Sequence, residues 1–345
     1  MKRNASSDET QEYAGASILI TGATGSIGGE LLRTLLKRRP KRIVVLSNDE
    51  NGLFETRSQI RGRGNVEFKL ADVRDNHSIE GAMKDCDYVF HAAALKHVTF
   101  CEGNPYEAIM TNVVGTQNVI DNAIKSGVRR FVFISTDKAV NPSSTLGATK
   151  LLGEKLVISA SKQTSRPIFS IVRFGNVIGS RGSVLTIFER QVKEGGPITV
   201  TDPNMTRFIM APSEAAELIL KAARVANPGE IFVLKMKTVK VGQLAEASRV
   251  FFSRRFGLDP SKIGVKQIGV APGEKLHEEL MNESESAGAI ESRDFYVINP
   301  NPSFGTRGAP RNLAGRRSFS SADVAPLKVP AIIEELSLLY GSKRS

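Results

Sequence analysis

Residues 17–28 read SILITGATGSIG and decide the fold. A short apolar run, typical of a buried strand, is followed by Gly22, Gly25 and Gly28, and residues 30–36 then have helical spacing. The glycines allow the backbone to approach a pyrophosphate at the N-terminus of the helix, where backbone N–H groups are unpaired. We therefore expect a dinucleotide to bind this turn, whose other members are Thr24, Ser26 and Ile27.

Strand-like and helix-like segments alternate along the chain after this turn. Helical spacing predicts helices at residues 108–125 and 146–161, and apolar runs predict strands at residues 42–46, 66–70, 87–91, 130–134 and 169–173. Apolar strands that alternate with helices predict an α/β fold with a Rossmann-like, doubly wound parallel sheet. The pattern breaks after residue 175, where prolines punctuate shorter segments.

The chain is expected to have three parts. We expect a disordered tail at residues 1–14, a dinucleotide-binding domain at 15–175, and a smaller C-terminal substrate lobe at 176–345 that is interleaved with the preceding domain. Residues 299–318, rich in Pro, Gly, Arg and Asn, predict a loop or mobile segment, and an amphipathic helix is expected at residues 329–340.

The composition narrows the class of protein. No apolar run is long enough to span a bilayer, and the N-terminus has no signal-peptide core, so a cytoplasmic location is expected. The net charge of +11 allows a nucleic-acid interpretation, but the basic patches are not interleaved with aromatics, and no nucleic acid is expected as a partner. Two cysteines cannot form a disulfide framework, and the four histidines lack metal-ligand spacing, which predicts no metal.

Several residues at predicted strand ends are candidate cofactor contacts. Ser47 occupies the position where an acid would bind the ribose of NAD, so NADP is weakly favoured and NAD stays possible. Asp72 is a candidate for the adenine amino group, although a solvated strand-end Asp fits the spacing equally well. Val73 follows it, and Ala92 and Ala93 are small enough for a backbone to pass close to a cofactor.

Thr136, Asp137 and Lys138 end the fifth predicted strand, where parallel sheets bind ligands. A carboxyl beside an amine supplies what the elimination of water requires, because one group protonates the leaving hydroxyl while the other takes a carbon-bound proton. A surface ion pair is an equally good interpretation of the adjacent Asp and Lys on composition alone.

The longer motifs resemble the extended short-chain dehydrogenase/reductase superfamily and, within it, the CapD-like polysaccharide-biosynthesis group that includes inverting UDP-N-acetylglucosamine 4,6-dehydratases. The resemblance covers residues 17–285 and rests on the glycine turn and on six further strings, which are FHAAALKHV at 90–98, STDKAVNP at 135–142, RFGNV at 173–177, GSRGSV at 179–184, TDPNMTRF at 201–208 and GEK at 273–275. Lys150 matches the family lysine, whereas Leu146 stands where short-chain dehydrogenases have a catalytic Tyr.

The resemblance implies a reaction in three steps. Hydride leaves C4 of a UDP-N-acetylhexosamine, water leaves from C5 and C6, and hydride returns to C6. Asp137 would protonate the C6 hydroxyl, and Lys138 would take the C5 proton, which requires the pKa of Lys138 to fall toward neutrality. The base for the C4 hydroxyl stays open between Thr136, Asp137 and a water held by Lys150, and so does inversion at C5.

The substrate contacts are expected from both halves of the chain. Asn176 resembles the Asn that contacts the nucleotide diphosphate in related enzymes, and Arg181 and Arg207 are candidates for phosphate contacts, with surface salt bridges as the alternative. Lys96 and His97 are expected to face the sugar site, although His97 fits a structural histidine equally well, and Glu274 is a further candidate substrate contact. A homo-oligomer is expected by analogy with the family.

Two other functions compete with a dehydratase. A UDP-hexose 4-epimerase also begins with hydride transfer from C4, but needs no acid–base pair at C5 and C6, so residues 136–138 favour the dehydratase. A non-catalytic NAD(P)-binding sensor or scaffold is favoured only by Leu146 and is opposed by Asp137, Lys138 and Lys150.

Overall fold

The centre of the molecule is one nine-stranded sheet. A computed structural model describes residues 12–60, 62, 64–300 and 318–341. The strands lie in the spatial order β14 (Ile290–Glu291), β15 (Phe295–Ile298), β10 (Ile231–Leu234), β6 (Ile168–Phe174), β5 (Arg130–Thr136), β4 (Tyr88–His91), β1 (Ser17–Thr21), β2 (Arg42–Ser47) and β3 (Val66–Leu70). From β3 to β10 every neighbouring pair is parallel, and only β15 and β14 run antiparallel to their neighbours. The expected doubly wound parallel sheet is therefore confirmed.

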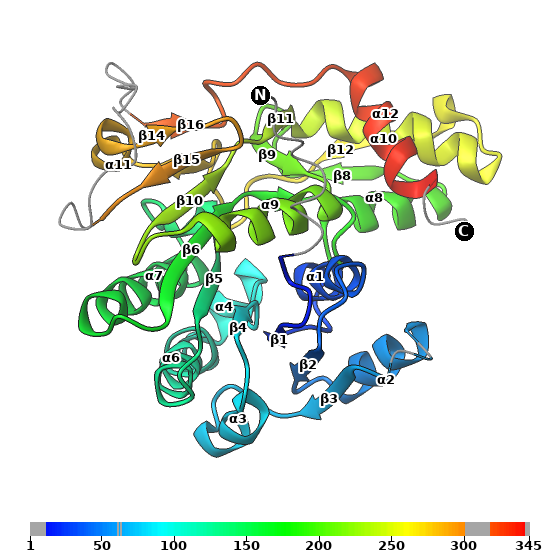
Figure 1. Cartoon of the computed structure of the whole chain (residues 1–345). Coiled ribbons are helices and arrows are strands. Elements are labelled where there is room, and N and C mark those ends of the chain that lie inside the picture. The colour runs from blue at the N-terminus through cyan, green and yellow to red at the C-terminus, as the bar shows by residue number, and fades with distance from the viewer. Residues whose placement is uncertain (1–11, 61, 63, 301–317, 342–345) are drawn as a thin grey trace, which may run out of the picture.

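Helices cover both faces of this sheet (Figure 1). One layer contains α1 (Ser26–Leu36) and α9 (Pro212–Val225), which pack against each other. The opposite layer contains α3 (Asn76–Met83), α6 (Gly115–Lys125) and α7 (Thr145–Gln163). Shorter connections form α2 (Glu50–Gln59), α4 (Val98–Gly103), α5 (Pro105–Ile109) and the π-helical turn η1 (Met110–Val114).

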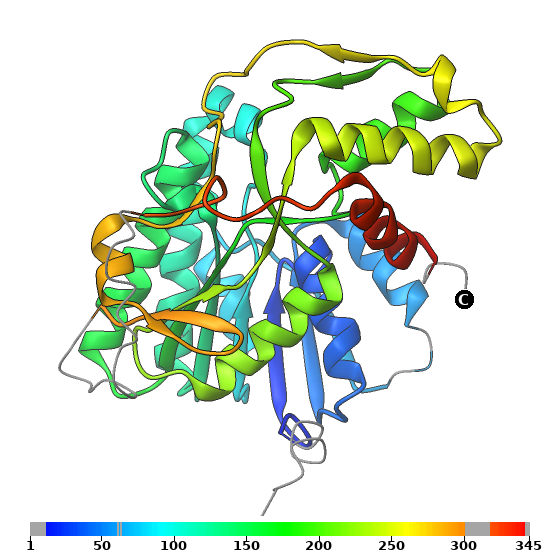
Figure 2. The same cartoon turned by 90° about the horizontal axis from the view of Figure 1, so that it is seen from above.

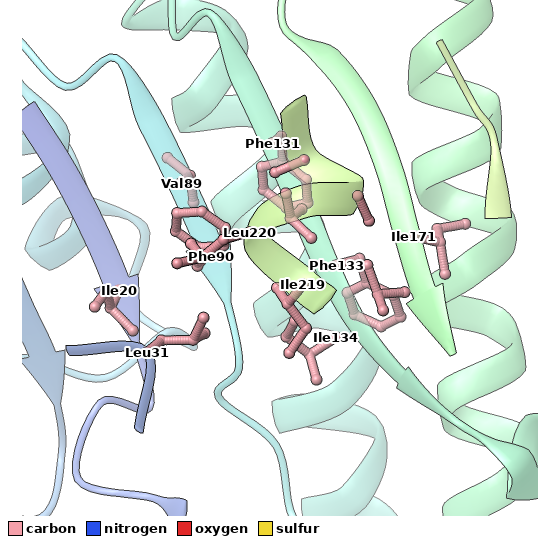
Figure 3. Packing of buried hydrophobic residues seen from close by; sticks show 14 of the residues in the cluster. Ile20, Leu31, Val89, Phe90, Phe131, Phe133, Ile134, Ile171, Ile219 and Leu220 are labelled. Carbon is pink, nitrogen blue, oxygen red and sulfur yellow. The ribbon is translucent and has the colours of Figure 1, made fainter. Parts of the chain in front are cut away.

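The main core lies between the sheet and α1 and α9. Figure 3 shows Leu31 of α1 with Ile219 and Leu220 of α9, gathered over side chains of the central strands such as Phe90 and Phe131. Successive residues 131–135 of β5 are all buried, as expected for a strand covered on both faces. Burial of this apolar surface is the main force that fixes the strand ends relative to one another.

A second group of elements gathers at one end of the sheet (Figure 2). It contains α8 (Val184–Lys193), α10 (Val241–Phe256), the turn η3 (Pro260–Lys262) and α12 (Val329–Gly341), which matches the helix expected near the C-terminus. In the later half of the described chain there are three small sheets. In the first, β9 (Thr206–Met210) lies between β11 (Lys237–Lys240) and β7 (Asn176–Val177); the other two pair β12 (Val265–Gln267) with β8 (Ile198–Val200) and β13 (Glu279–Met281) with β16 (Phe319–Ser320). A separate apolar core holds α8, α10 and α12 together.

The expected disordered tail and the expected loop or mobile segment at residues 299–318 lie largely outside the described residues. Residues 1–11 and 301–317 are not described. Residues 12–14 differ from the expectation, because Tyr13 is fully buried and its hydroxyl donates a hydrogen bond to the carbonyl of Leu220 at 2.8 Å. Both cysteines are buried, and in the described part of the chain no helix is long and apolar enough to cross a membrane.

Candidate active site

A large cavity follows the carboxyl ends of the parallel strands. Its volume is about 1160 Å³, more than one drug-sized ligand needs. All the predicted site residues lie in the described part of the chain, and within it only Asp72 and Asp137 are not part of the cavity lining. The glycine turn, the end of β5 and the candidate substrate contacts therefore share one space.

The glycine turn lies tightly between β1, the end of β4 and α1. Gly22 has φ = +64°, and a Cβ there would come within 2.6 Å of the backbone of Ala93. A Cβ on Gly28 would lie 2.5 Å from the carbonyl oxygen of Gly22. Because side chains are excluded at both positions, the N-terminus of α1 opens onto the cavity with its N–H groups available to an anion.

The end of β2 carries polar side chains and no carboxylate at its last position. The hydroxyls of Ser47 and Thr24 are hydrogen-bonded at 2.9 Å. Asp72 accepts hydrogen bonds from Asn48 and Arg74, and the Arg74 side chain lowers the pKa of this carboxyl. Asp72 is thus engaged by its neighbours, while Arg74 is a lining cation that the sequence analysis did not select.

Lys150 lies on α7, against the last residues of β5. Its Nζ donates to the carbonyl of Ile134 at 2.5 Å and lies 3.9 Å from the centre of the Phe133 ring. Burial lowers the pKa of Lys150 to about 7, and Glu154 one turn later opposes the shift. Leu146, one turn earlier, lines the cavity with an apolar side chain, so it supplies no proton acceptor there.

The end of β5 continues into the turn η2 (Asp137–Ala139), which presents the candidate acid–base residues. Thr136 Oγ1 and Lys138 Nζ both donate to Asp137 Oδ1, at 2.8 and 3.0 Å. Asp137 is fully buried, and its Oδ2 has no hydrogen-bond partner among the residues that the structure describes. Asp137 is therefore connected to the cavity by hydrogen bonds from the side chains of Thr136 and Lys138, which line it.

Lys138 also faces a second carboxylate. Glu278 Oε1 lies 3.4 Å from Lys138 Nζ and 3.8 Å from Arg207 Nε. Burial alone would lower the pKa of Lys138, but Asp137 and Glu278 raise it above its usual value, contrary to the fall expected for a base. Burial and repulsion from Asp137 raise the pKa of Glu278.

A loop from the second half of the chain lies across the mouth of the glycine turn. The backbone N–H of Arg181 donates to Ser26 Oγ at 3.0 Å, and Lys96 Nζ donates to the Arg181 carbonyl at 2.7 Å. Gly182 lies against the ring of His97, because a Cβ there would come within 2.6 Å of the imidazole. Lys96, His97 and Arg181 are thus brought together beside the glycine turn.

The remaining predicted substrate contacts have distinct environments. Asn176 begins β7 and is half-buried on the cavity wall. Arg207 is held by the carbonyls of Thr206 and Leu276, in addition to its approach to Glu278. Glu274 is exposed, and it accepts only a long hydrogen bond from the backbone of Ala271 at 3.4 Å.

Two internal polar networks support the site and were not predicted. Glu154 on α7 accepts from Ser135 at 2.5 Å and pairs with Arg173 of β6 at 2.6 Å, with all three side chains buried. Asn112, in the π-helical turn η1, pairs with both backbone groups of Leu95. This turn interrupts the predicted continuous helix at 108–125 and holds the strand-end loop in place. Glu154 and Arg173 are visible in the sequence, but spacing alone does not pair them.

No metal centre is evident in the described residues. No group of three or more His, Cys, Asp or Glu side chains there could hold an ion.

Sequence comparison identifies relatives over most of the chain. The family model described as "Polysaccharide biosynthesis protein" matches residues 18–300. An uncharacterized membrane protein, MJ1061 of Methanocaldococcus jannaschii, is 46% identical over 96% of this chain and 99% of its own length. A UDP-N-acetylglucosamine 4,6-dehydratase (inverting) of Campylobacter jejuni is 39% identical over 84% of both chains. A UDP-glucose 4-epimerase of Rickettsia rickettsii is also 39% identical, over 83% of both.

The chain matches part of one larger relative and nearly all of one solved structure. It is 44% identical to the capsular polysaccharide biosynthesis protein CapD of Staphylococcus aureus but spans only 47% of CapD. Pen from Bacillus thuringiensis superimposes with a TM-score of 0.88 at 39% identity, covering 94% of this chain and 98% of Pen. DesIV, a dTDP-glucose 4,6-dehydratase from Streptomyces venezuelae solved with NAD, shares the fold at 21% identity with a TM-score of 0.68, over 75% of this chain and 86% of DesIV.

Proposed function

Because the chain belongs to the polysaccharide biosynthesis protein family, we propose that it is a nicotinamide-dependent UDP-N-acetylhexosamine 4,6-dehydratase, with UDP-N-acetylglucosamine as its substrate. The observation that carries the proposal is the meeting of two features in one cavity. The glycine turn that fits a pyrophosphate lines the same space as Thr136 and Lys138 at the end of β5, and both of these side chains donate hydrogen bonds to the buried Asp137. The name of the Campylobacter relative supports the dehydratase chemistry.

The cofactor would occupy the half of the cavity formed by β1, α1 and the ends of β2 and β4. Gly22, Gly25 and Gly28 leave room for a diphosphate against the N-terminus of α1, and Ala92 and Ala93 leave room beside it. We propose NADP as the preferred form, because Ser47 places no carboxylate against a 2′-phosphate and Arg74 supplies a cation nearby. When bound, a nicotinamide cofactor would supply the acceptor for hydride from C4 and the donor of hydride to C6.

The residues at the end of β5 would handle the protons. Thr136 lines the cavity and donates to Asp137, so it can pass the proton of the C4 hydroxyl to that buried carboxylate. Asp137 then returns this proton through Thr136 to the leaving C6 hydroxyl, and water is released. Lys138 takes the C5 proton and, after hydride reaches C6, returns to C5 one of its ammonium protons, which exchange with solvent. In this scheme Leu146 needs no proton-transfer role.

A 4-epimerase is the second candidate, because the Rickettsia relative is as similar as the dehydratase from Campylobacter. Incubation with UDP-N-acetylglucosamine in deuterated water, followed by NMR, separates the two functions. We expect a 4-keto-6-deoxy product that carries deuterium at C5. A product that keeps its C6 hydroxyl and gains no deuterium would instead establish the epimerase.

Two variants test the assigned roles in the same experiment. Asp137→Asn and Lys138→Ala should each lower kcat by about 100-fold or more, because each removes a proton-transfer group. Both should keep the cofactor, since neither residue is part of the glycine turn. Normal turnover by either variant would remove the role that we assign to that residue.

A further inference from the structure

Lys138 lies between two buried carboxylates, and this arrangement conflicts with its role as a base. Asp137 Oδ1 lies 3.0 Å from Lys138 Nζ, and Glu278 Oε1 lies 3.4 Å from it. A buried amine with two carboxylate neighbours is held as an ammonium ion. An ammonium cannot accept the C5 proton, so the site needs a group that first removes one proton from Lys138.

We propose that Glu278 is a third acid–base group of the sugar site and exchanges a proton with Lys138 during each turnover. This inference rests on the dehydratase function proposed above. Glu278 is the second carboxylate against Lys138 and, unlike Asp137, it also lines the cavity. The exposed fraction of Glu278 is 4%, so little water competes with this contact.

The proton transfers balance in this scheme. An N–H bond of the Lys138 ammonium breaks while an O–H bond forms on the Glu278 carboxylate, which leaves a neutral amine and a neutral acid. The amine takes the C5 proton as the C6 hydroxyl leaves. After hydride reaches C6, the ammonium returns a proton to C5, and Glu278 returns its own proton to Lys138. The cycle ends in its starting state, with water as the only group lost.

The surroundings of Glu278 suit this exchange. The charged groups that face its carboxyl are Asp137 and Lys138 on η2 and Arg207 on β9. Burial and the negative charge of Asp137 favour the protonated form of Glu278, whereas Lys138 and Arg207 favour the carboxylate. The net effect raises the pKa of Glu278, which brings its protonated form closer in free energy to the carboxylate.

The backbone of Glu278 is fixed from both sides by one buried serine. Ser321 Oγ accepts from the N–H of Glu278 at 2.9 Å, and the N–H of Ser321 donates to the carbonyl of Glu278 at 2.8 Å. Ser321 is itself hydrogen-bonded to Thr206, next to Arg207. The fixed backbone keeps the Glu278 carboxyl beside the end of β5, 3.4 Å from Lys138 Nζ, so a small approach of the two side chains brings them to hydrogen-bond distance.

The test compares Glu278→Gln with Glu279→Gln in the full chain with its cofactor. Glu279 is the matched control, because its carboxylate faces Asn141 and Lys275 and, within the described residues, is not part of the cavity lining. We expect Glu278→Gln to lower kcat for UDP-N-acetylglucosamine by about 100-fold, with KM and cofactor affinity changed less than threefold. Glu279→Gln should stay within twofold of the unaltered protein.

The pH profile of kcat separates proton transfer from a structural role. Activity of the unaltered protein should fall at low pH as Glu278 becomes protonated and can no longer accept a proton. The residual activity of Glu278→Gln should lack this acidic limb. A kcat within threefold of the unaltered protein, an unchanged acidic limb, or a rise in KM alone would each overturn the proposal.

Two further outcomes are also decisive. If Glu278→Gln loses its cofactor or fold, Glu278→Asp is measured in its place, because it keeps a carboxyl one methylene further away. A fall in kcat of tenfold or more with the cofactor retained supports the proposal, and a full kcat overturns it. Failure of the unaltered protein to form the 4-keto-6-deoxy product would count against the dehydratase function. Equal turnover by the unaltered protein and the Glu278 variant would count only against the role proposed for Glu278.

Discussion

The two halves of the cavity are built in different ways. The cofactor half consists of backbone and small side chains, and its glycine turn comes from one stretch of twelve residues, 17–28. The sugar half consists of buried charges from distant parts of the chain, where Lys138 on η2 meets Glu278 just before β13. In the proposed function, the cofactor half would bind its ligand by leaving space for it, and the sugar half would act through charges placed at fixed distances.

This difference decides which substitutions each half tolerates. In the cofactor half an added atom is harmful, because the backbone groups around Gly22 and Gly28 cannot move aside. In the sugar half the volume of a side chain matters less than its charge, since removing one member leaves another charge buried without its partner.

The largest effect is expected for Gly28→Val. A Cβ at this position lies 2.5 Å from the carbonyl oxygen of Gly22, so α1 must shift away from the turn. We expect the affinity for NADP to fall by 100-fold or more, measured by titration calorimetry, because the N–H groups of α1 no longer face the diphosphate. The control is Gly81→Val on α3, where a Cβ meets nothing within 4 Å. Equal NADP binding by Gly28→Val would show that the turn is not the diphosphate site.

An intermediate effect is expected at Lys150, between the two halves. Its folded-state pKa is about 7 against an ordinary value of 10.5, so between these values the unfolded chain binds a proton that the folded protein has lost. The free energy of unfolding should therefore rise with pH in this window, by up to about 1.4 kcal/mol per unit relative to Lys150→Met. Urea denaturation of cofactor-free protein at pH 7, 8 and 9 measures the slope.

The control for this experiment is Lys155→Met on the exposed face of the same helix, which should follow the pH dependence of the unaltered protein. Parallel pH curves for Lys150→Met and the unaltered protein would show that Lys150 does not titrate in this range. The site would then be less dry than its burial indicates.

The smallest effect is expected for Ser47→Asp. A carboxylate at the end of β2 would repel a 2′-phosphate and accept a hydrogen bond from a free ribose hydroxyl. We expect the Kd for NADP to rise by about tenfold while the Kd for NAD stays the same or falls, measured by fluorescence titration. The control, Ser58→Asp on α2, adds the same charge away from this strand end. An unchanged preference would contradict our assignment of Ser47.

Much of the cofactor half could be predicted from sequence because its signals are local. The strand, the glycine spacing and the helix follow one another at residues 17–36, and each has its own pattern. The end of β5 was also found this way, since residues 136–138 are adjacent. The resemblance to the CapD-like group, now confirmed by the family match, added the candidate contacts from the later half.

The rest depends on pairings that no local pattern specifies. Glu274 was selected from its motif, but Glu278, four residues later, faces Lys138 because Thr206 bridges to His277 and Ser321 holds its backbone. The π-helical turn around Asn112 was predicted as ordinary helix, because its apolar spacing differs little from that of an α-helix. Hydrogen bonds between distant segments of the chain determine both the position of Glu278 and the π-helical turn around Asn112.

The hydrogen bonds between Ser321 and the backbone of Glu278 have a consequence for the synthesis of the polypeptide chain. A nascent polypeptide that has reached residue 300 already contains the glycine turn, the β5 end and Glu278, but not the serine that fixes this carboxyl. On the ribosome, the nucleotide-binding half can thus mature before the sugar-handling half, whose geometry is completed only after β16 is translated and pairs with β13.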